Sequence, residues 1–285
     1  AHFTSAQRER RRLHRGGLSD AWRGLDEQLV DPAEELASLA TDRRLALFIG
    51  AGVSAGAGAP SWHALLTCLA AQAGIGGDEL ARFQELPAMD RAALLEQRLG
   101  RAELKRMSAG LVRKQHASVT HMMLAALPVR EVVTTNYDDL FELASASLCE
   151  VSVLPHGPRP RAPRWILKLH GCISDPDSIV LTREDYLRYA QGRGALAGIV
   201  QALLMTRRLL FVGFGLGDDN FHRIADEVRR ASVHGEERFG TNIVIEDQEL
   251  QRQLWRQDLD WISVKRPGDD LATAARRLEI FLDRV

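Results

Sequence analysis

The segment from Leu45 to Pro60 constrains the fold of this chain more than any other. The apolar run Leu45–Ile49 is typical of a buried strand, and it breaks into a glycine-rich turn before the helical pattern of Trp62–Ala73. Glycines at a strand-to-helix turn let a ligand approach the backbone, and the partial positive charge of the next helix N-terminus suits a diphosphate. Such glycines also pack helices onto strands. The turn by itself therefore leaves both readings open.

The turn does not match the two common nucleotide-binding fingerprints. No Lys-Ser/Thr pair closes it, so it is not the P-loop of nucleoside triphosphatases. Its third glycine comes one residue too late for the G-x-G-x-x-G pattern. The rest of the chain has to decide what the turn does.

Composition excludes several classes of function. The 285 residues are 45% hydrophobic and carry a net charge of −1, as in a globular protein without a basic field for nucleic acid or membrane. No apolar run approaches the ~20 residues of a membrane span. The scattered cysteines, Cys68, Cys149 and Cys172, form neither a disulfide framework nor a Cys-x-x-Cys pair. We expect a cytoplasmic protein, with no membrane and no nucleic acid among its partners.

The chain divides into an N-terminal arm and one main domain. Residues 1–30 are rich in arginine and predict a solvated tail, or a helix that orders against a partner or an acidic surface. Residues 31–285 form the main domain, which opens with a helix at Pro32–Ala40. Apolar positions at helical spacing across 62–127 predict a helical insertion between the first two strands.

Strand and helix patterns alternate through the rest of the chain. Further strands are predicted at Val129–Thr135, Val151–Leu154, Trp165–Leu169, Ser178–Leu181, Leu209–Val212, Thr241–Glu246 and Trp261–Val264. Helices are predicted at Asp138–Ala146, Ala195–Met205, Phe221–Arg230, Gln248–Gln257 and Leu271–Leu282, with another that starts at a capping-box pattern at Thr182. This alternation predicts an α/β fold with a doubly wound parallel sheet.

Polar or small residues follow the predicted strands at four places. These turns are Gly50–Ser54, Thr134–Asp138, Lys168–Gly171 and Gly213–Asp218. Ligands of an open parallel sheet bind outside the carboxyl ends of its strands, so we expect the four turns to meet at one crevice. Each also has a plain structural reading: Asn136 as a turn residue, Asp138 as a helix cap and His170 as a structural histidine.

Taken together, the turns resemble a known family. Gly50-Ala51-Gly52-Val53-Ser54, Thr135-Asn136-Tyr137-Asp138, Leu169-His170-Gly171 and Gly213-Phe214-Gly215 resemble the sirtuin superfamily in order and spacing. The resemblance covers roughly residues 30–285 and implies a Rossmann-like, sirtuin-type fold. Two Cys-x-x-Cys pairs, which build the zinc ribbon of protein-deacylating sirtuins, are missing, so we expect no zinc ribbon and no metal. These departures look like bacterial sirtuin-like effector domains that hydrolyse NAD in anti-phage defence.

The resemblance also implies roles for individual residues. Asn136 is expected to orient a water and the ribose hydroxyls, His170 to act as general base, and Asp138 to accept from the nicotinamide carboxamide. NAD, as substrate, is expected to lie against Gly50, Ala51, Gly52, Ser54, Thr135, Tyr137, Gly213, Phe214 and Gly215. Glu246 is expected either to meet the adenosine ribose or to be a solvated turn acid.

Three other functions compete with NAD hydrolysis. One is a protein deacylase that uses NAD, which the missing zinc cysteines disfavour. Another is a non-catalytic module that binds NAD or ADP-ribose. A nucleic-acid enzyme is disfavoured by the net charge and the lack of a carboxylate cluster. An abortive-infection enzyme must be silent at rest, so we expect a homo-oligomer or a partner, for which the family offers an ATPase as precedent.

Overall fold

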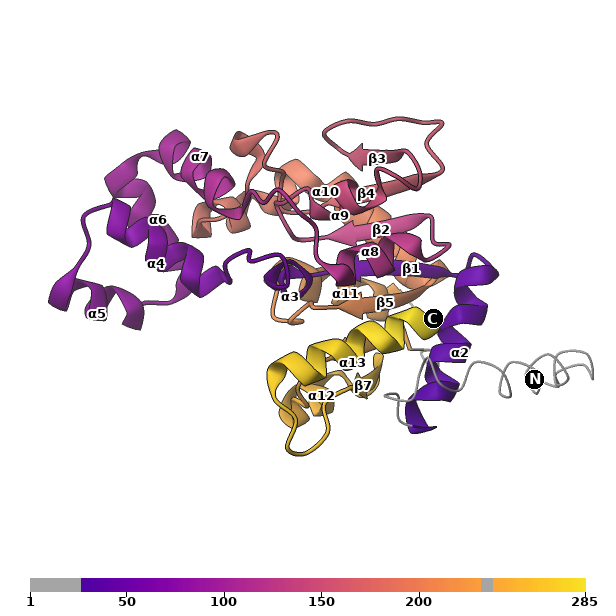
Figure 1. Cartoon of the computed structure of the whole chain (residues 1–285). Coiled ribbons are helices and arrows are strands. Elements are labelled where there is room, and N and C mark those ends of the chain that lie inside the picture. The colour runs from indigo at the N-terminus through magenta and orange to yellow at the C-terminus, as the bar shows by residue number, and fades with distance from the viewer. Residues whose placement is uncertain (1–26, 232–237) are drawn as a thin grey trace, which may run out of the picture.

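A computed structural model describes residues 27–231 and 238–285 (Figure 1). The arm predicted over residues 1–30 lies outside the described residues, except where helix α2 (Glu27–Thr41) begins. This helix starts earlier than the predicted Pro32 and contains that proline in its second turn.

The centre of the molecule is one seven-stranded sheet in which every neighbouring pair of strands is parallel. Its strands are β1 (Leu45–Ile49), β2 (Glu131–Thr134), β3 (Val151–Leu154), β4 (Arg164–Lys168), β5 (Arg208–Val212), β6 (Gly240–Val244) and β7 (Leu259–Ser263). They follow the order β3-β4-β2-β1-β5-β6-β7. The predicted doubly wound α/β fold is confirmed.

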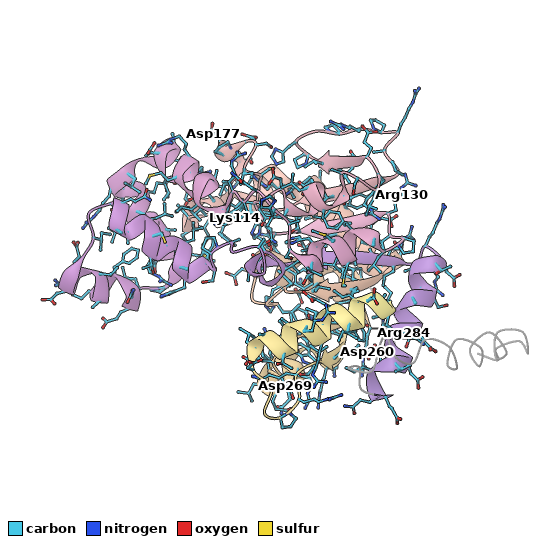
Figure 2. All side chains as sticks on the ribbon, viewed as in Figure 1. Lys114, Arg130, Asp177, Asp260, Asp269 and Arg284 are labelled. Atoms are coloured by element: carbon cyan, nitrogen blue, oxygen red, sulfur yellow. The ribbon has the colours of Figure 1, made fainter. Side chains whose placement is uncertain are left out.

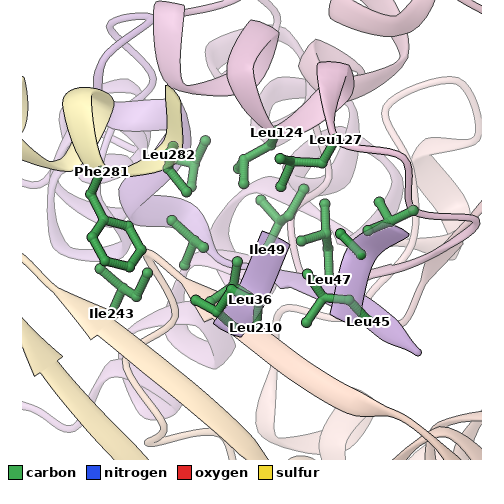
Figure 3. Packing of buried hydrophobic residues seen from close by; sticks show 14 of the residues in the cluster. Leu36, Leu45, Leu47, Ile49, Leu124, Leu127, Leu210, Ile243, Phe281 and Leu282 are labelled. Carbon is green, nitrogen blue, oxygen red and sulfur yellow. The ribbon is translucent and has the colours of Figure 1, made fainter. Parts of the chain in front are cut away.

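The sheet is buried on both faces, which explains the apolar strands. Along β1, Leu45, Leu47 and Ile49 pack into the hydrophobic cluster on one face (Figure 3). Ala46 and Phe48, which alternate with them, pack into the cluster on the opposite face. Since successive side chains of a strand point to opposite faces, a strand covered on both sides has to be apolar throughout.

Helices form the layer on each face. One face carries α2, α8 (Val119–Ala126), α9 (Leu140–Ser145) and α13 (Leu271–Arg284). The other carries α10 (Arg183–Thr206), α11 (Asp219–Ala231) and α12 (Glu249–Trp255). Helices α2 and α13 lie side by side (Figure 1), where Arg284 binds Glu34 at 2.6 Å (Figure 2 labels Arg284). The last helix of the chain therefore closes onto the first one described.

The insertion between β1 and β2 is helical, as predicted. After α3 (Ala51–Ala55) it comprises α4 (Trp62–Gln72), α5 (Gly77–Glu85), α6 (Ala88–Leu99), α7 (Arg101–Val112) and α8. Helices α4 to α7 form a lobe that projects from the sheet (Figure 1). The lobe has its own apolar core, which also takes up Tyr137, Ile179 and Leu181 of the sheet domain. The lobe is thereby packed next to the turn that follows β2.

Two local predictions were wrong. Ser178–Leu181 is no strand: η1 (Pro176–Ser178) is a single 3₁₀ turn, and the Val180 amide donates to the carbonyl of His170. The glycine turn does not run straight to the helix at Trp62 either, because α3 starts directly at Ala51. The two helices predicted from Thr182 and at Ala195–Met205 form one element, α10, with a break at Arg193.

None of the helices within the described ranges combines the length and the apolar character that a membrane span requires.

Candidate active site

The four predicted turns meet at a single cavity. They follow β1, β2, β4 and β5, which are neighbours in the sheet, at their carboxyl ends. The cavity encloses about 440 Å³, within the ~300–1,000 Å³ range of small-molecule sites. Its lining includes Ala51, Ser54, Thr135, Asn136, Tyr137, Asp138, His170, Gly213, Phe214, Gly215, Gly217, Asp218 and Asp219, with Trp62, Leu65, Met89 and Val112 from the helical lobe and Tyr186 from α10.

The position of the cavity follows from the winding of the chain. Strand β2, which follows β1 in the chain, lies beside β1 on one edge. The chain later crosses to β5, which lies beside β1 on its other edge. Connections that diverge from a central strand leave a crevice at its carboxyl end, which is where doubly wound folds bind ligands.

Asn136 is the centre of a buried hydrogen-bond network. Its side-chain amide donates to the Gly50 carbonyl and to Ser54 Oγ, both at 3.0 Å. Ser54 Oγ in turn donates to Asp138 Oδ2 at 2.8 Å. The network ties the turn after β1 to the turn after β2. It also explains why a serine stands at position 54, since the hydroxyl both accepts and donates.

This network fixes which way the Asn136 amide faces. A reversed amide would set Oδ1 against the Gly50 carbonyl oxygen, so Nδ2 has to point there. Oδ1 is then buried without a hydrogen-bond partner among the described residues. A buried amide oxygen without a partner is costly, and such a group in a native protein calls for an explanation, such as a bound water, an ion or a catalytic role.

A buried ion pair also holds the turn after β2. Lys168 is 1% exposed, donates to the Asp138 carbonyl and lies 2.9 Å from Glu142 Oε1. Burial tends to lower the pKa of Lys168, but the carboxylate of Glu142 and its other neighbours outweigh burial and raise it. Burial raises the pKa of Glu142 in spite of Lys168. Because the Lys168 ammonium also donates to a backbone carbonyl, we treat Lys168 as charged throughout. The charge of Glu142 then depends on the presence of Lys168.

His170 follows β4 and is 4% exposed. Its ring meets Tyr186 and Tyr189 edge to face, with centroids 5.5 and 5.8 Å apart. Its Nε2 lies 3.3 Å from Asp218 Oδ2 without hydrogen-bond geometry, so Nε2 is buried without a hydrogen bond among the described residues. Catalytic contacts are often long or poorly aligned in a protein without substrate and tighten when substrate binds.

Asp218 is held by groups from two other segments. The Phe221 amide donates to its Oδ1 at 2.9 Å, and the Tyr186 hydroxyl donates to its Oδ2 at 3.3 Å. Burial alone would raise the pKa of Asp218, but His170 and these donors outweigh burial and lower it. Asp218 is therefore an anion at neutral pH. Burial and the nearby Asp218 carboxylate raise the pKa of Tyr186, which keeps its proton.

The loop that carries His170 is fixed on both sides. Arg193, at the break in α10, donates to the carbonyl of Leu169 at 2.6 Å and to that of Ser178. Gly171 has φ +95°, and a Cβ there would meet the Ser178 oxygen at 2.3 Å. Only glycine fits at this position, so the backbone turn after His170 depends on Gly171.

The glycines after β1 pack against the turn after β5. A Cβ on Gly50 would meet the Gly213 oxygen at 2.4 Å, and one on Gly52 would meet the Gly213 Cα at 2.8 Å. The Gly50 and Gly52 amides donate to the Val212 and Gly213 carbonyls. Both glycines thus pack one turn onto another, and neither lines the cavity. A Cβ on Gly215, by contrast, would meet nothing within 4 Å, so a ligand can approach its backbone closely.

The remaining predicted site residues lie as follows. Ala51, Ser54, Thr135, Asn136, Tyr137, Asp138, His170, Gly213, Phe214 and Gly215 all line the cavity. Tyr137 donates its hydroxyl to the Val180 carbonyl at 2.7 Å, so it packs the wall of the cavity. Glu246 is an exposed acid paired with Lys265 at 2.6 Å, which agrees with the plainer of its two readings.

Sequence reasoning missed several residues of the cavity. Asp218 ends the glycine-rich turn after β5, and that position is a signal that could have indicated a role for it. Trp62 and Met89 come from the insertion and Tyr186 from α10. No pattern in the sequence indicates that these helices reach the cavity.

The cavity is acidic. The lining drawn from the described part of the chain includes the carboxylates of Asp138, Asp218 and Asp219 and contains no lysine or arginine. Within the described ranges, no group of three His, Cys, Asp or Glu side chains is arranged to hold a metal ion. The charge of the lining favours a cationic part of a ligand near Asp138 and Asp218.

Comparison with known proteins bears on the identity of this site. Residues 130–260 match the family model of the SIR2-like domain. Relatives include NAD(+) hydrolase ThsA of Enterococcus faecium, 30% identical over 65% of this chain and 40% of the relative. NAD(+) hydrolase ThsA of Bacillus cereus is 27% identical over 67% of this chain and 41% of the relative. Defense-associated sirtuin 2 of Bacillus subtilis is 23% identical over 75% of this chain and 22% of the relative.

These matches confirm the resemblance to the sirtuin superfamily. The matched residues include the turn after β2, His170 and the turn after β5. The chain spans less than half the length of these curated relatives.

Proposed function

We propose that this chain, whose residues 130–260 match the SIR2-like domain, hydrolyses NAD to nicotinamide and ADP-ribose. One observation carries the proposal: the Asn136 amide oxygen, which has no partner within residues 27–231 and 238–285, and the imidazole of His170 line one cavity at the carboxyl edge of the sheet. These side chains follow different strands, Asn136 after β2 and His170 after β4.

The bond to be broken joins ribose C1′ to the nicotinamide nitrogen. The leaving group is already cationic, so it needs no proton, and the transition state has the character of an oxocarbenium ion. The protein has to hold the dinucleotide, direct a water and accept one proton. The Asp138 and Asp218 carboxylates support this chemistry, because anions near C1′ stabilise developing positive charge.

Asn136 is suited to directing the water. Both amide hydrogens are used within the protein, so only Oδ1 is left to accept from a water or a ribose hydroxyl. An oxygen that accepts a water proton turns the water's lone pair away from itself and toward the reacting carbon.

His170 is suited to taking the proton, from the water itself or through a ribose hydroxyl. A neutral imidazole carries one free lone pair and is the usual general base near neutral pH. Asp138 has both oxygens engaged, by Ser54 and by the Leu140 amide, so we assign it to binding the carboxamide from a fixed position.

The relatives support this activity. Two are named NAD(+) hydrolase, and a third is named as a defence-associated sirtuin. We extend the proposal to a role in abortive infection within the cytoplasm, with a trigger that is a homo-oligomer or a partner such as an ATPase. The reason is physical: an enzyme that drains NAD harms its own cell unless it is held silent.

The test is to incubate the purified chain with NAD and separate the products by chromatography. We expect nicotinamide and ADP-ribose, with at least a roughly 10²-fold loss in Asn136→Ala and in His170→Ala, about the size of a general-base contribution. The control is His116→Ala, at an exposed histidine of the insertion. Full activity in both site variants would refute the roles assigned here.

The same assay separates the competing functions. With an acetylated peptide present, a deacylase releases nicotinamide together with acetylated ADP-ribose, whereas a hydrolase yields plain ADP-ribose. If NAD binds by calorimetry and no nicotinamide is released, alone or with candidate partners, the chain is a binding module. Particle mass measured alongside reports whether self-association accompanies activity.

A further inference from the structure

Asp218 has more contacts than a helix cap requires. It precedes α11 and accepts from the Phe221 amide through Oδ1, as an N-cap aspartate does. Its second oxygen is not needed for the cap and faces His170 Nε2 at 3.3 Å and the Tyr186 hydroxyl at 3.3 Å. The cap fixes the carboxylate, and the fixed carboxylate presents one oxygen to the imidazole.

We propose that Asp218 is a positioning residue that holds the His170 imidazole with Nε2–H toward its carboxylate and leaves Nδ1 as the nitrogen that accepts the proton. This inference rests on the proposed NAD hydrolysis. A carboxylate beside one nitrogen selects the tautomer that donates to it and stabilises the imidazolium that forms on proton uptake, as in hydrolase triads.

The described residues offer the His170 ring one anionic partner. Tyr186 and Tyr189 of α10 and Asp218 of the turn after β5 contact the ring from other elements. Both tyrosines have raised pKa values because of burial, so they are neutral. Asp218 is therefore the anion that the imidazole meets, and the Tyr186 hydroxyl keeps the carboxylate from turning away.

The decisive variant is Asp218→Asn. Asparagine caps a helix about as well as aspartate, so the fold and the cap are kept while the charge is lost. Asparagine presents either an oxygen or an amide to Nε2, so the tautomer is no longer fixed. The control is Asp226→Asn, the same substitution at an exposed position of α11 that binds Arg230.

We expect the turnover number of Asp218→Asn to fall about 10²-fold with little change in KM. Asp218→Glu should recover part of the lost activity, and Asp226→Asn should behave as wild type. A rise in KM with unchanged turnover would instead make Asp218 a binding residue and overturn the proposal.

A second readout does not depend on turnover. Long-range ¹H–¹⁵N spectra of the imidazoles, with His170→Gln to assign the signal, report which ring nitrogen carries the proton. We expect the Nε2–H form in the wild type and a mixture in Asp218→Asn. An Nδ1–H form in the wild type, or an identical spectrum in the variant, would overturn the proposal. If the protein gives the expected spectra but releases no nicotinamide, only the proposed function is contradicted, and the positioning role of Asp218 stands.

Discussion

The buried pair of Lys168 and Glu142 yields a quantitative prediction. In Lys168→Met the ammonium is replaced by an apolar chain of similar length, and Glu142 is left buried without its counter-ion. The Asp138 carbonyl also loses its donor. Breaking one side of a buried ion pair costs about 3–5 kcal/mol of unfolding free energy. At roughly 2–4 °C per kcal/mol for a domain near this size, Tm should fall by roughly 6–20 °C.

Two further variants test the cause of that loss. Lys168→Met combined with Glu142→Gln removes both charges and should recover much of the stability, because no charge remains unpaired. Lys265→Met is the matched control, since its pair with Glu246 is exposed and such pairs contribute little to stability. Urea unfolding at pH 7 measures all three.

The pH dependence gives the sign. Burial raises the pKa of Glu142, and loss of Lys168 raises it further. A carboxyl whose pKa is raised in the folded state does not lower the free energy of unfolding below its unfolded pKa, because it is neutral in both states there. It lowers the free energy of unfolding most at neutral pH. The deficit of Lys168→Met should therefore shrink as pH falls from 7 toward about 4.5. A variant as stable as the wild type at pH 7, or a deficit that does not change with pH, would refute this account of the pair.

Two other predictions concern the turns around the cavity. Gly213→Ala should destabilise the fold by about 2–4 kcal/mol, because φ is +64° and the new Cβ would meet the Val53 amide nitrogen at 2.6 Å. In Gly215→Ala the new Cβ would meet nothing within 4 Å, so Tm should stay within a few degrees and NAD binding should weaken instead. Thermal melts measure the first effect and calorimetry the second. Ser54→Ala should lower nicotinamide release at least tenfold and stability by about 1–2 kcal/mol, because Asn136 loses a hydrogen-bond partner that fixes its amide. Unchanged kinetics would show that the network does not orient Asn136.

Much of the fold followed from local pattern. Leu45–Ile49 is β1 with the predicted bounds, because a strand buried on both faces is apolar at every position and no helix pattern competes with it. The capping box at Thr182 and Asp185 is present, because its hydrogen bonds are local. The predicted strand at Ser178–Leu181 failed because groups outside the segment bind its backbone: Arg193 donates to the Ser178 carbonyl, and the Val180 amide donates to the His170 carbonyl.

What the sequence determined by itself is the set of side chains at the strand ends. Parallel strands bring their carboxyl ends to one edge, so the alternation of strand and helix was enough to predict that Asn136, Asp138 and His170 lie near each other. Only the tertiary structure decided which partners each group has there. It turned Gly50 and Gly52 into packing glycines and left Asn136 Oδ1 unpartnered among the described residues. It also brought Asp218 and Tyr186 to His170, because contacts between separate turns depend on how the whole sheet and α10 pack, and no local pattern encodes them.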